Sequence, residues 1–306
     1  MLSPQAAQAI QLAGDLPTGL SPQELREVYT RERMKLQPPR PEVAEVREIS
    51  IPGRDGPIPA RVYVPFGGTA PRPLLVYFHG GGWVVGSLEG YDTSCRRLAL
   101  AADCVVVSVD YRLAPEHPFP AAVHDAWDAV TWCVGAATEL GIDTSRVIVA
   151  GDSAGGSLAT VVALQARDEN GPAIALQVLI YPATDLTRES PSYVRNASGY
   201  MLTTAALRWF IERYVPDVRQ RADWRASPLL HPSLAGVAPA LVISAEYDPL
   251  VDENEAYAKR LEDAGVPTHY ECFPGMIHPF FTLGGVVEEA AQAERLIADA
   301  IARIPR

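Results

Sequence analysis

A serine lies in the five-residue stretch Gly151-Asp152-Ser153-Ala154-Gly155, directly after the apolar run Val147–Ala150 and before a segment with helical character. A tight turn between a strand and a helix strains the backbone of such a serine, and it requires almost no side chain two positions before and after it. The turn exposes the hydroxyl at the helix N-terminus, where developing negative charge is favoured. The five residues alone are a weak signal, but their position between strand and helix is specific. Ser153 is therefore predicted to be a catalytic nucleophile.

A glycine-rich element, His79-Gly80-Gly81-Gly82, follows another predicted buried strand. Glycines allow backbone N–H groups to point at one spot, which stabilises the oxyanion that forms during acyl transfer. We expect the N–H groups of Gly81, Gly82 and Ala154 to form this oxyanion hole. His79 is expected to anchor the loop through hydrogen bonds rather than to act as a base. A phosphate-binding loop is disfavoured because its Lys and Ser/Thr are absent.

A nucleophilic serine also needs a general base. Only three histidines follow Ser153 in the sequence. His231 lies in an irregular stretch, and His269 begins a predicted strand. His278 lies in a predicted loop between the last strand and the final helix, which favours it as the base.

The base in turn needs a carboxylate that orients it. The segment after the predicted strand Leu241–Ser244 offers four acids: Glu246, Asp248, Asp252 and Glu253. Asp248 is the one nearest to the strand end that is followed by a proline, which delays the next helix. Asp252 is expected to cap that helix, and Glu246 remains a less favoured alternative. The predicted triad is Ser153, Asp248 and His278.

The elements that must position these groups alternate along the chain. Short apolar runs predict strands that are buried on both faces, as in a parallel sheet covered by helices. The predicted strands are Leu74–Phe78, Val105–Val109, Val147–Ala150, Ala175–Ile180, Leu241–Ser244 and Tyr270–Phe273. The predicted helices are Thr93–Ala102, Ala121–Leu140, Gly155–Asp168, Glu253–Ala264 and Val286–Ile304. An antiparallel hairpin of Val43–Ile51 and Ile58–Val64 precedes them.

Two segments fall outside this alternation. At the N-terminus, Gln5–Leu12 is helix-like, and a capping box at Ser21–Glu24 opens a helix that is expected to reach about Leu36. Between Tyr181 and Leu241 lie about sixty residues, more than a crossover needs, with helical periodicity over Leu202–Tyr214. We expect both segments to form a cap over the site, although a decorative insertion is the alternative. The predicted boundaries are 1–42 for the N-terminal cap helices, 43–184 and 226–306 for the core, and 185–225 for the cap insertion.

Composition narrows the class of protein. The 306 residues are 48% apolar and 21% charged, as in a globular protein, and the formal net charge of −11 disfavours nucleic acid or an anionic membrane as partner. No run approaches the roughly 18–20 apolar residues of a membrane span, and no signal peptide is predicted at the N-terminus. The four cysteines form no Cys-x-x-Cys pair, so we expect small core residues in a reducing cytoplasm and no metal site; they are Cys95, Cys104, Cys133 and Cys272.

Several ordered motifs together resemble the hormone-sensitive-lipase-like carboxylesterases, within the α/β hydrolases. The motifs are His79–Gly82 with Trp83, Tyr111–Glu116 continuing through Pro118–Ala121, Gly151–Gly155, and Asp248–Leu250 with Asp252. The resemblance covers the chain from about Val43 to the C-terminus. The aspartate at position 152 resembles the motif of the family's larger microbial branch. The resemblance implies an α/β-hydrolase fold with a mostly parallel eight-stranded sheet flanked by helices and a helical cap. It also implies hydrolysis of short- to medium-chain esters without a cofactor, by a monomer or homodimer whose partner is a small ester.

The resemblance also implies roles for individual residues. The Tyr111–Ala121 segment would brace the oxyanion loop, which leaves His117 without a catalytic role. The implied substrate-binding residues are Trp83, Asp152, Leu202 and Phe210. The family usually has glycine after its catalytic histidine, whereas Pro279 follows His278 here, and proline fixes φ and removes an N–H.

Three other readings remain. An amidase, peptidase or thioesterase would use the same triad, and only a comparison of substrates separates them. A dehalogenase would need aspartate at position 153. A non-enzymatic receptor on this scaffold, such as the plant gibberellin receptors, would lack the catalytic histidine, so the complete predicted triad favours an enzyme.

Overall fold

An eight-stranded sheet lies at the centre of the computed structural model, which describes residues 1–13, 19–68 and 71–305. Its strand order is β1-β2-β4-β3-β5-β6-β7-β8. The strands are β1 (Glu45–Gly53), β2 (Gly56–Val64), β3 (Arg72–Phe78), β4 (Val105–Val109), β5 (Ile142–Asp152), β6 (Leu176–Ile180), β7 (Ala240–Tyr247) and β8 (Thr268–Ile277). β2 pairs antiparallel with β1 and β4, and the other neighbours pair parallel. The predicted mostly parallel sheet is confirmed.

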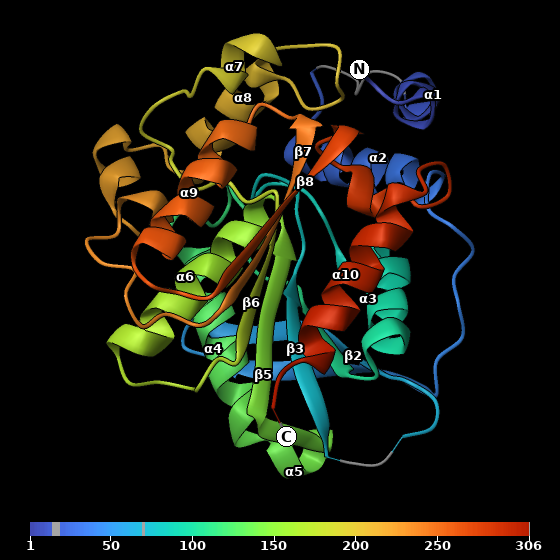
Figure 1. Ribbon diagram of the computed structural model, residues 1–306, viewed down its shortest axis with the longest axis vertical. Coiled ribbons are helices and arrows are strands. Elements are labelled where there is room, and N and C mark those ends of the chain that lie inside the picture. Colours follow the sequence, from blue (N-terminus) through green and yellow to red (C-terminus); the bar gives the residue numbers. More distant parts are fainter. Residues whose placement is uncertain (14–18, 69–70, 306) are drawn as a thin grey trace.

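Helices cover both faces of this sheet. They are α1 (Pro4–Ala13), α2 (Pro22–Met34), α3 (Leu88–Ala102), α4 (Ala121–Gly135), α5 (Ala137–Leu140), α6 (Ala154–Asp168), α7 (Ser192–Arg195), α8 (Thr204–Tyr214), α9 (Val251–Asp263) and α10 (Glu289–Ala302). Figure 1 shows α3 and α10 on one face and α4, α6 and α9 on the other. The segment Ala121–Leu140, predicted as one helix, divides at Ala136 into α4 and α5.

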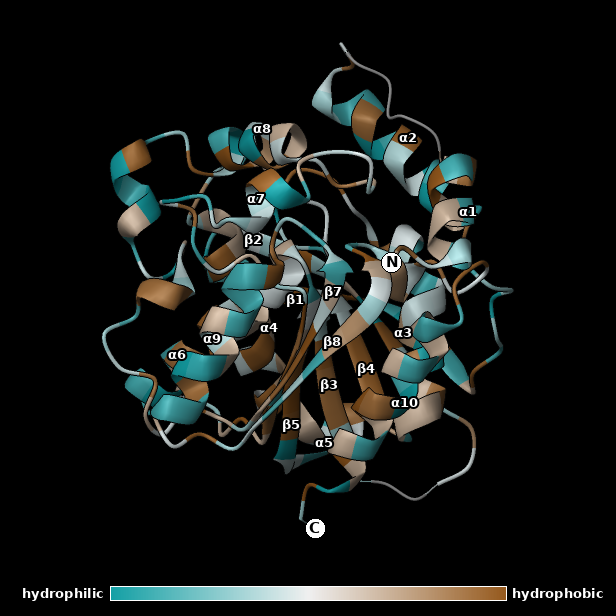
Figure 2. Ribbon diagram, turned by 45° about the horizontal axis from the view of Figure 1, so that its top comes forward, coloured by the Kyte–Doolittle hydropathy of each residue, from teal (hydrophilic) through white to brown (hydrophobic). Residues whose placement is uncertain are grey.

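The central strands are apolar throughout because both of their faces lie against helices. Every residue of β3 is buried, and Figure 2 shows hydrophobic colour along β3, β4 and β5. Successive side chains alternate between two cores: Val76 packs into the core beneath α4 and α6, and Tyr77 into the core beneath α3 and α10. The continuous apolar pattern therefore reports burial on both sides rather than one buried face.

Four helices lie across the carboxyl end of the parallel strands: α1 and α2 from the N-terminal segment, and α7 and α8 from the insertion after β6 (Figure 1). The predicted capping box is present, since Ser21 Oγ accepts from the Glu24 N–H and Glu24 Oε2 accepts from the Ser21 N–H. The helix it opens ends at Met34, two residues before the expected end. Residues 14–18 of the predicted N-terminal cap and 69–70 of the predicted core lie outside the described ranges.

The last strand is longer than predicted. β8 continues to Ile277, so the segment after Phe273 that was expected to be a loop belongs to the sheet. Pro274 and Gly275 favour a loop locally, but a register shift accommodates them, and the pairing resumes with Ile277 opposite Tyr247. The correction matters for the site, because His278 directly follows a paired strand residue.

Candidate active site

The strand-to-helix turn at Ser153 has the strained conformation that its motif predicts. Ser153 lies between the end of β5 and the start of α6 with φ 54° and ψ −121°. The turn brings backbones together: a Cβ on Gly155 would lie 1.9 Å from the Phe78 carbonyl oxygen, and one on Gly151 would lie 2.4 Å from Gly155. Both positions therefore require glycine, and the turn depends on contact with the end of β3.

Alanine at position 155 is expected to destabilise the fold severely, because its Cβ would meet backbone that cannot move as a flexible side chain would. Overpacking of this kind costs about 1–3 kcal/mol or more, and about 1 kcal/mol lowers Tm by roughly 2–4 °C in a chain of this size or somewhat smaller. Gly135→Ala is the matched control: Gly135 is also helical, and a Cβ there meets nothing within 4 Å. Thermal unfolding should show a large loss for Gly155→Ala and no loss for Gly135→Ala. Equal Tm values would contradict the assigned role of Gly155.

The predicted triad residues lie within hydrogen-bonding distance of one another. His278 Nε2 is 2.8 Å from Ser153 Oγ, and His278 Nδ1 is 2.6 Å from Asp248 Oδ2. Asp248 directly follows β7 and His278 directly follows β8, so two neighbouring parallel strands deliver them to the same edge of the sheet. The Asp248 side chain is fully buried. The order serine, histidine, carboxylate is the one that acyl transfer by a serine nucleophile requires.

The alternative acids and histidines have other partners. Glu246 accepts a hydrogen bond from the Gly275 N–H at 2.7 Å, away from the histidine. His231 binds Asp168 at 2.9 Å, and His269 lies 3.5 Å from Glu271. None of the three lies in the hydrogen-bonded chain that starts at Ser153.

The expected cap role of Asp252 is wrong. The N-cap position of α9 is Leu250, and its N–H donates to Asp248 Oδ1 at 2.8 Å. Asp252 lies inside the helix and instead accepts from the Ser192 N–H at 2.8 Å and from Arg195 at 2.5 Å. Asp248, the predicted triad acid, thus accepts the hydrogen bond at the start of α9, and the two contacts of Asp252 connect that helix to α7.

Proline after the histidine fits the local backbone. Pro279 is the N-cap of the 3₁₀ helix η3 (Phe280–Thr282), with φ −85°, about 5° beyond the usual proline range. Its carbonyl accepts hydrogen bonds from the Thr282 N–H and hydroxyl, each at 3.0 Å. Pro279, which departs from the family pattern, therefore lies between the end of β8 and the start of η3. His278 still lies within hydrogen-bonding distance of Ser153.

The glycine-rich loop has left-handed backbone at its three central residues: φ is 123° at Gly81, 58° at Gly82 and 60° at Trp83. Within the described ranges, no group accepts a hydrogen bond from the N–H of Gly81, Gly82 or Ala154. Two of these N–H groups lie in the loop, and the third lies at the start of α6. An oxyanion hole requires donors of this kind, which have no partner in the protein.

His79 anchors this loop, as predicted. Its ring stacks on Tyr111 at a centroid distance of 4.4 Å, and its Nδ1 lies 2.9 Å from the Gly80 carbonyl oxygen. Tyr111 also donates its hydroxyl to the His79 carbonyl at 2.6 Å. Burial lowers the pKa of His79, which favours a neutral ring. The segment that begins at Tyr111 therefore braces the oxyanion loop.

The four implied substrate-binding residues lie in different surroundings. Phe210 of α8 packs directly over the oxyanion loop, since a Cβ on Gly82 would lie 2.3 Å from its ring. Leu202 is half-buried and packs against the hydrophobic core beneath α4 and α6. The Trp83 ring is buried and stacks on Tyr214 at 4.2 Å, so it supports the cap from below rather than facing a substrate.

A substrate-binding role for Asp152 stays a prediction, and the structure gives its carboxylate partners within the protein. Its carboxylate is 1% exposed and turns away from the nucleophile's hydroxyl into the core beneath α3. It accepts hydrogen bonds from the Gly80 N–H at 2.9 Å and from the hydroxyls of Tyr77 and Tyr91 at 2.9 and 3.0 Å. A fully hydrogen-bonded buried carboxylate holds its surroundings in place and offers little to a substrate.

Three supporting residues have no signal in the sequence. Asn196, which follows α7, donates to the Asp248 carbonyl at 2.9 Å, and Arg33 of α2 lies beside Asp152. The Tyr181 ring also packs on His278 at a centroid distance of 4.5 Å. These residues are far from their partners in sequence and belong to no motif, so only the fold reveals them.

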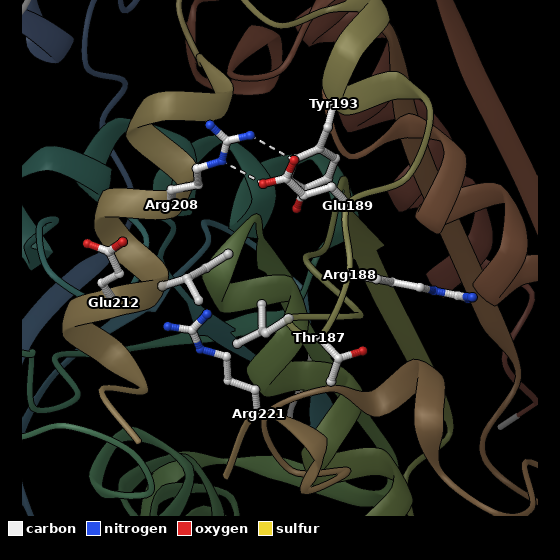
Figure 3. A pocket seen from close by; sticks show the side chains of 9 residues that line it. Thr187, Arg188, Glu189, Tyr193, Arg208, Glu212 and Arg221 are labelled. Carbon is white, nitrogen blue, oxygen red and sulfur yellow. Dashed lines mark hydrogen bonds and ion pairs between the residues drawn. The ribbon is translucent and has the colours of Figure 1, made fainter. Parts of the chain in front are cut away.

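A separate pocket of about 240 Å³ lies beside α8 and includes no triad residue. Figure 3 shows charged side chains around it, with Arg208 of α8 holding Glu189 through two hydrogen bonds of 2.6 and 2.8 Å. This ion pair ties α8 to the chain that follows β6. All of its lining residues fall between Leu186 and Arg221, within the predicted insertion.

The described residues offer no metal-binding cluster of three or more His, Cys, Asp or Glu side chains. Cys95, Cys104 and Cys133 are buried free thiols, as expected, and Cys272 is half-buried. In the part of the chain that the structure covers, no helix has the length and apolar character to span a membrane.

The sheet and its strand-to-helix turn at Ser153 define an α/β-hydrolase fold. A family model described as "alpha/beta hydrolase fold" matches residues 75–282. The chain belongs to this family of α/β hydrolases, and its relatives place it among the carboxylic ester hydrolases of the family.

Relatives of this chain carry esterase names. The chain is 46% identical to the carboxylic ester hydrolase LipN of Mycobacterium tuberculosis over 88% of its own length and 73% of the relative's. It is 44% identical to the ethyl acetate hydrolase of Pseudomonas putida, over 84% of this chain and 82% of that one. Among solved structures, an ester hydrolase from the Lake Arreo metagenome superposes with a TM-score of 0.94 at 42% identity and 98% coverage of both chains. These relatives confirm the resemblance to carboxylesterases.

Proposed function

We propose that this protein is a carboxylesterase that hydrolyses short- to medium-chain carboxylic esters through Ser153, His278 and Asp248. The observation that carries the proposal is the unbroken hydrogen-bonded chain from Ser153 Oγ through the imidazole to the buried Asp248 carboxylate. The names of the relatives support esters as the substrate class.

Acylation begins when Ser153 attacks the ester carbonyl. His278 Nε2 takes the hydroxyl proton, and Asp248 accepts the Nδ1–H, which fixes the tautomer and stabilises the imidazolium that forms. The negative charge on the carbonyl oxygen is held by the N–H groups of Gly81, Gly82 and Ala154. His278 then protonates the departing alcohol, which leaves an acyl group on Ser153.

Deacylation repeats these steps with water. His278 takes a proton from the water as it attacks the acyl carbonyl, the same oxyanion hole stabilises the second tetrahedral intermediate, and the imidazolium returns the proton to Ser153. The second intermediate collapses to release the carboxylic acid, and the proton that left with the alcohol has been replaced by one from water. The triad thus returns to its starting state without a metal or organic cofactor.

The cap sets the size of the acyl group in this proposal. The N-terminal helices and the insertion, over residues 1–42 and 185–225, cover the carboxyl end of the sheet, and Phe210 packs over Gly82 of the oxyanion loop. A ring at that position shortens the space next to the reacting carbonyl. Short and medium acyl chains fit such a covered site better than long ones.

An acyl-chain series of p-nitrophenyl esters, from acetate to laurate, tests this. We expect kcat/KM to be highest for short or medium chains and to fall by at least about tenfold towards laurate, since each pocket clash costs a few kcal/mol. Phe210→Ala should shift the optimum towards longer chains, because it removes the ring over Gly82. A wild-type preference for laurate would contradict the covered pocket.

Matched esters and amides separate this activity from amide hydrolysis by the same triad. We expect turnover of the ester and little turnover of the amide. A fluorophosphonate probe tests the receptor reading, because covalent labelling requires an activated serine. Folded protein that is not labelled at Ser153 would favour a receptor.

A further inference from the structure

A buried negative charge lies directly beside the nucleophile. Asp152, the residue before Ser153, accepts the Gly80 N–H on one carboxylate oxygen, and a Cβ on Gly80 would lie only 2.5 Å from the other. The carboxylate therefore fixes the first glycine of the loop whose next two residues supply oxyanion donors. Burial raises the pKa of Tyr77 and of Tyr91 well above the usual value, so both phenols stay protonated and donate to Asp152.

The countercharge comes from a distant part of the chain. Arg33, in the last turn of α2, places Nη2 at 3.5 Å from Asp152 Oδ2. Its guanidinium also lies over the Tyr91 ring, 4.7 Å from the centroid, and donates to the Tyr29 hydroxyl. Only 8% of Arg33 is exposed. An arginine so deeply buried is stable only with a partner of opposite charge, and the same holds for the carboxylate.

We propose that Arg33 is a positioning residue for the reaction: by neutralising Asp152 it allows the carboxylate to hold Gly80, and through Gly80 it fixes the oxyanion donors. This role rests on the proposed esterase function. The N-terminal helix α2 is then part of the catalytic framework as well as a cover, because it supplies the one cation that contacts this carboxylate among the described residues.

Arg33 acts in this proposal through its positive charge more than through the volume of its side chain. Removing one partner of a buried ion pair leaves an uncompensated charge, whereas removing both leaves none. Asn at position 152 keeps an oxygen that can accept from Gly80 and Tyr77 but has no charge. The structure therefore predicts that loss of the Asp152 charge relieves the damage caused by loss of the Arg33 charge.

The experiment compares Arg33→Met, Asp152→Asn and the double variant by kcat, KM and hydrogen–deuterium exchange of the 79–86 loop. Arg33→Met should lower kcat by about tenfold or more with little change in KM, as expected for misplaced catalytic groups, and should speed exchange in the loop. The double variant should be more active than Arg33→Met and should regain loop protection. Arg33→Lys, which keeps the charge, should retain most of the activity.

Arg31→Met is the matched control, because Arg31 lies on the same helix, is largely exposed and, among the residues that the structure describes, pairs only with the adjacent Glu32. It should behave as wild type. The proposal is overturned if Arg33→Met leaves kcat and loop exchange unchanged, or if the double variant loses at least as much as the two single losses combined. If Arg33→Met does not fold, a folded double variant with a protected loop supports the proposal and an unfolded one overturns it. Exchange needs no substrate, so it tests Arg33 even if wild-type protein hydrolyses no ester.

Discussion

Alanine in place of Ser153 is expected to abolish turnover of a p-nitrophenyl ester, with kcat about 10⁶-fold below wild type, as for loss of the nucleophile in other serine hydrolases. The hydroxyl is the only group within hydrogen-bonding distance of His278 Nε2 in the described chain that can attack a carbonyl. Alanine and serine meet the same backbone strain at φ 54°, so the fold should survive. Stopped-assay rates and circular dichroism measure the two effects separately.

The control for this variant is Ser145→Ala, which changes an exposed serine at the other end of β5. It should keep wild-type kcat. Fluorophosphonate labelling should disappear in Ser153→Ala and persist in Ser145→Ala. Near wild-type turnover by folded Ser153→Ala would overturn the nucleophile assignment.

Asparagine in place of Asp248 is expected to lower kcat by about 10⁴-fold, the loss seen when the triad acid becomes an amide. Asp248 lies 2.6 Å from His278 Nδ1 and is fully buried, so an amide N–H facing that nitrogen would favour the wrong tautomer. The Asn side chain has nearly the same volume, so Tm should change much less than kcat. A pre-steady-state burst assay on an activated ester would locate the loss in acylation.

Glu246→Gln is the matched comparison, because Glu246 is the alternative acid on the same strand. Its carboxylate accepts from the Gly275 N–H, and glutamine retains an oxygen for that bond. Activity should therefore stay within about twofold of wild type, as for a surface substitution that keeps its hydrogen bond. A loss in Glu246→Gln as large as that in Asp248→Asn would reverse the assignment of the acid.

The local parts of the site could be predicted from the sequence because their constraints are local. Gly151 and Gly155 are required by backbone contacts within one turn, and contacts with the end of the neighbouring strand β3 add to that requirement. The strand before Asp248 is a continuous apolar run, which reports burial on both faces, whereas the strand before His278 is partly exposed and was predicted from its place in the alternation. Their order along the chain then places both side chains at the carboxyl edge of the sheet.

Element boundaries depended on pairing partners that the sequence does not specify. Pro274 and Gly275 favour a loop in isolation, yet β7 extends β8 through them to Ile277. Asp252 is of a residue type that commonly caps helices. The helix α9 nevertheless begins earlier, with Leu250 at its N-cap position, and the Leu250 N–H donates to Asp248. At β8 a tertiary contact outweighs the local preference, whereas at α9 a local hydrogen bond between residues two apart sets the earlier start of the helix.

The sequence by itself was enough to predict the candidate reacting groups: a serine on a glycine turn, a histidine after the last strand and an aspartate after the strand before it. Only the tertiary structure decided what each buried charge does. Asp152 belongs to the nucleophile's motif, but its partners Gly80, Tyr91 and Arg33 lie about 60 to 120 residues away in the chain. A carboxylate accepts from whichever donors the fold brings within about 3 Å, and that distance is a property of packing rather than of sequence spacing.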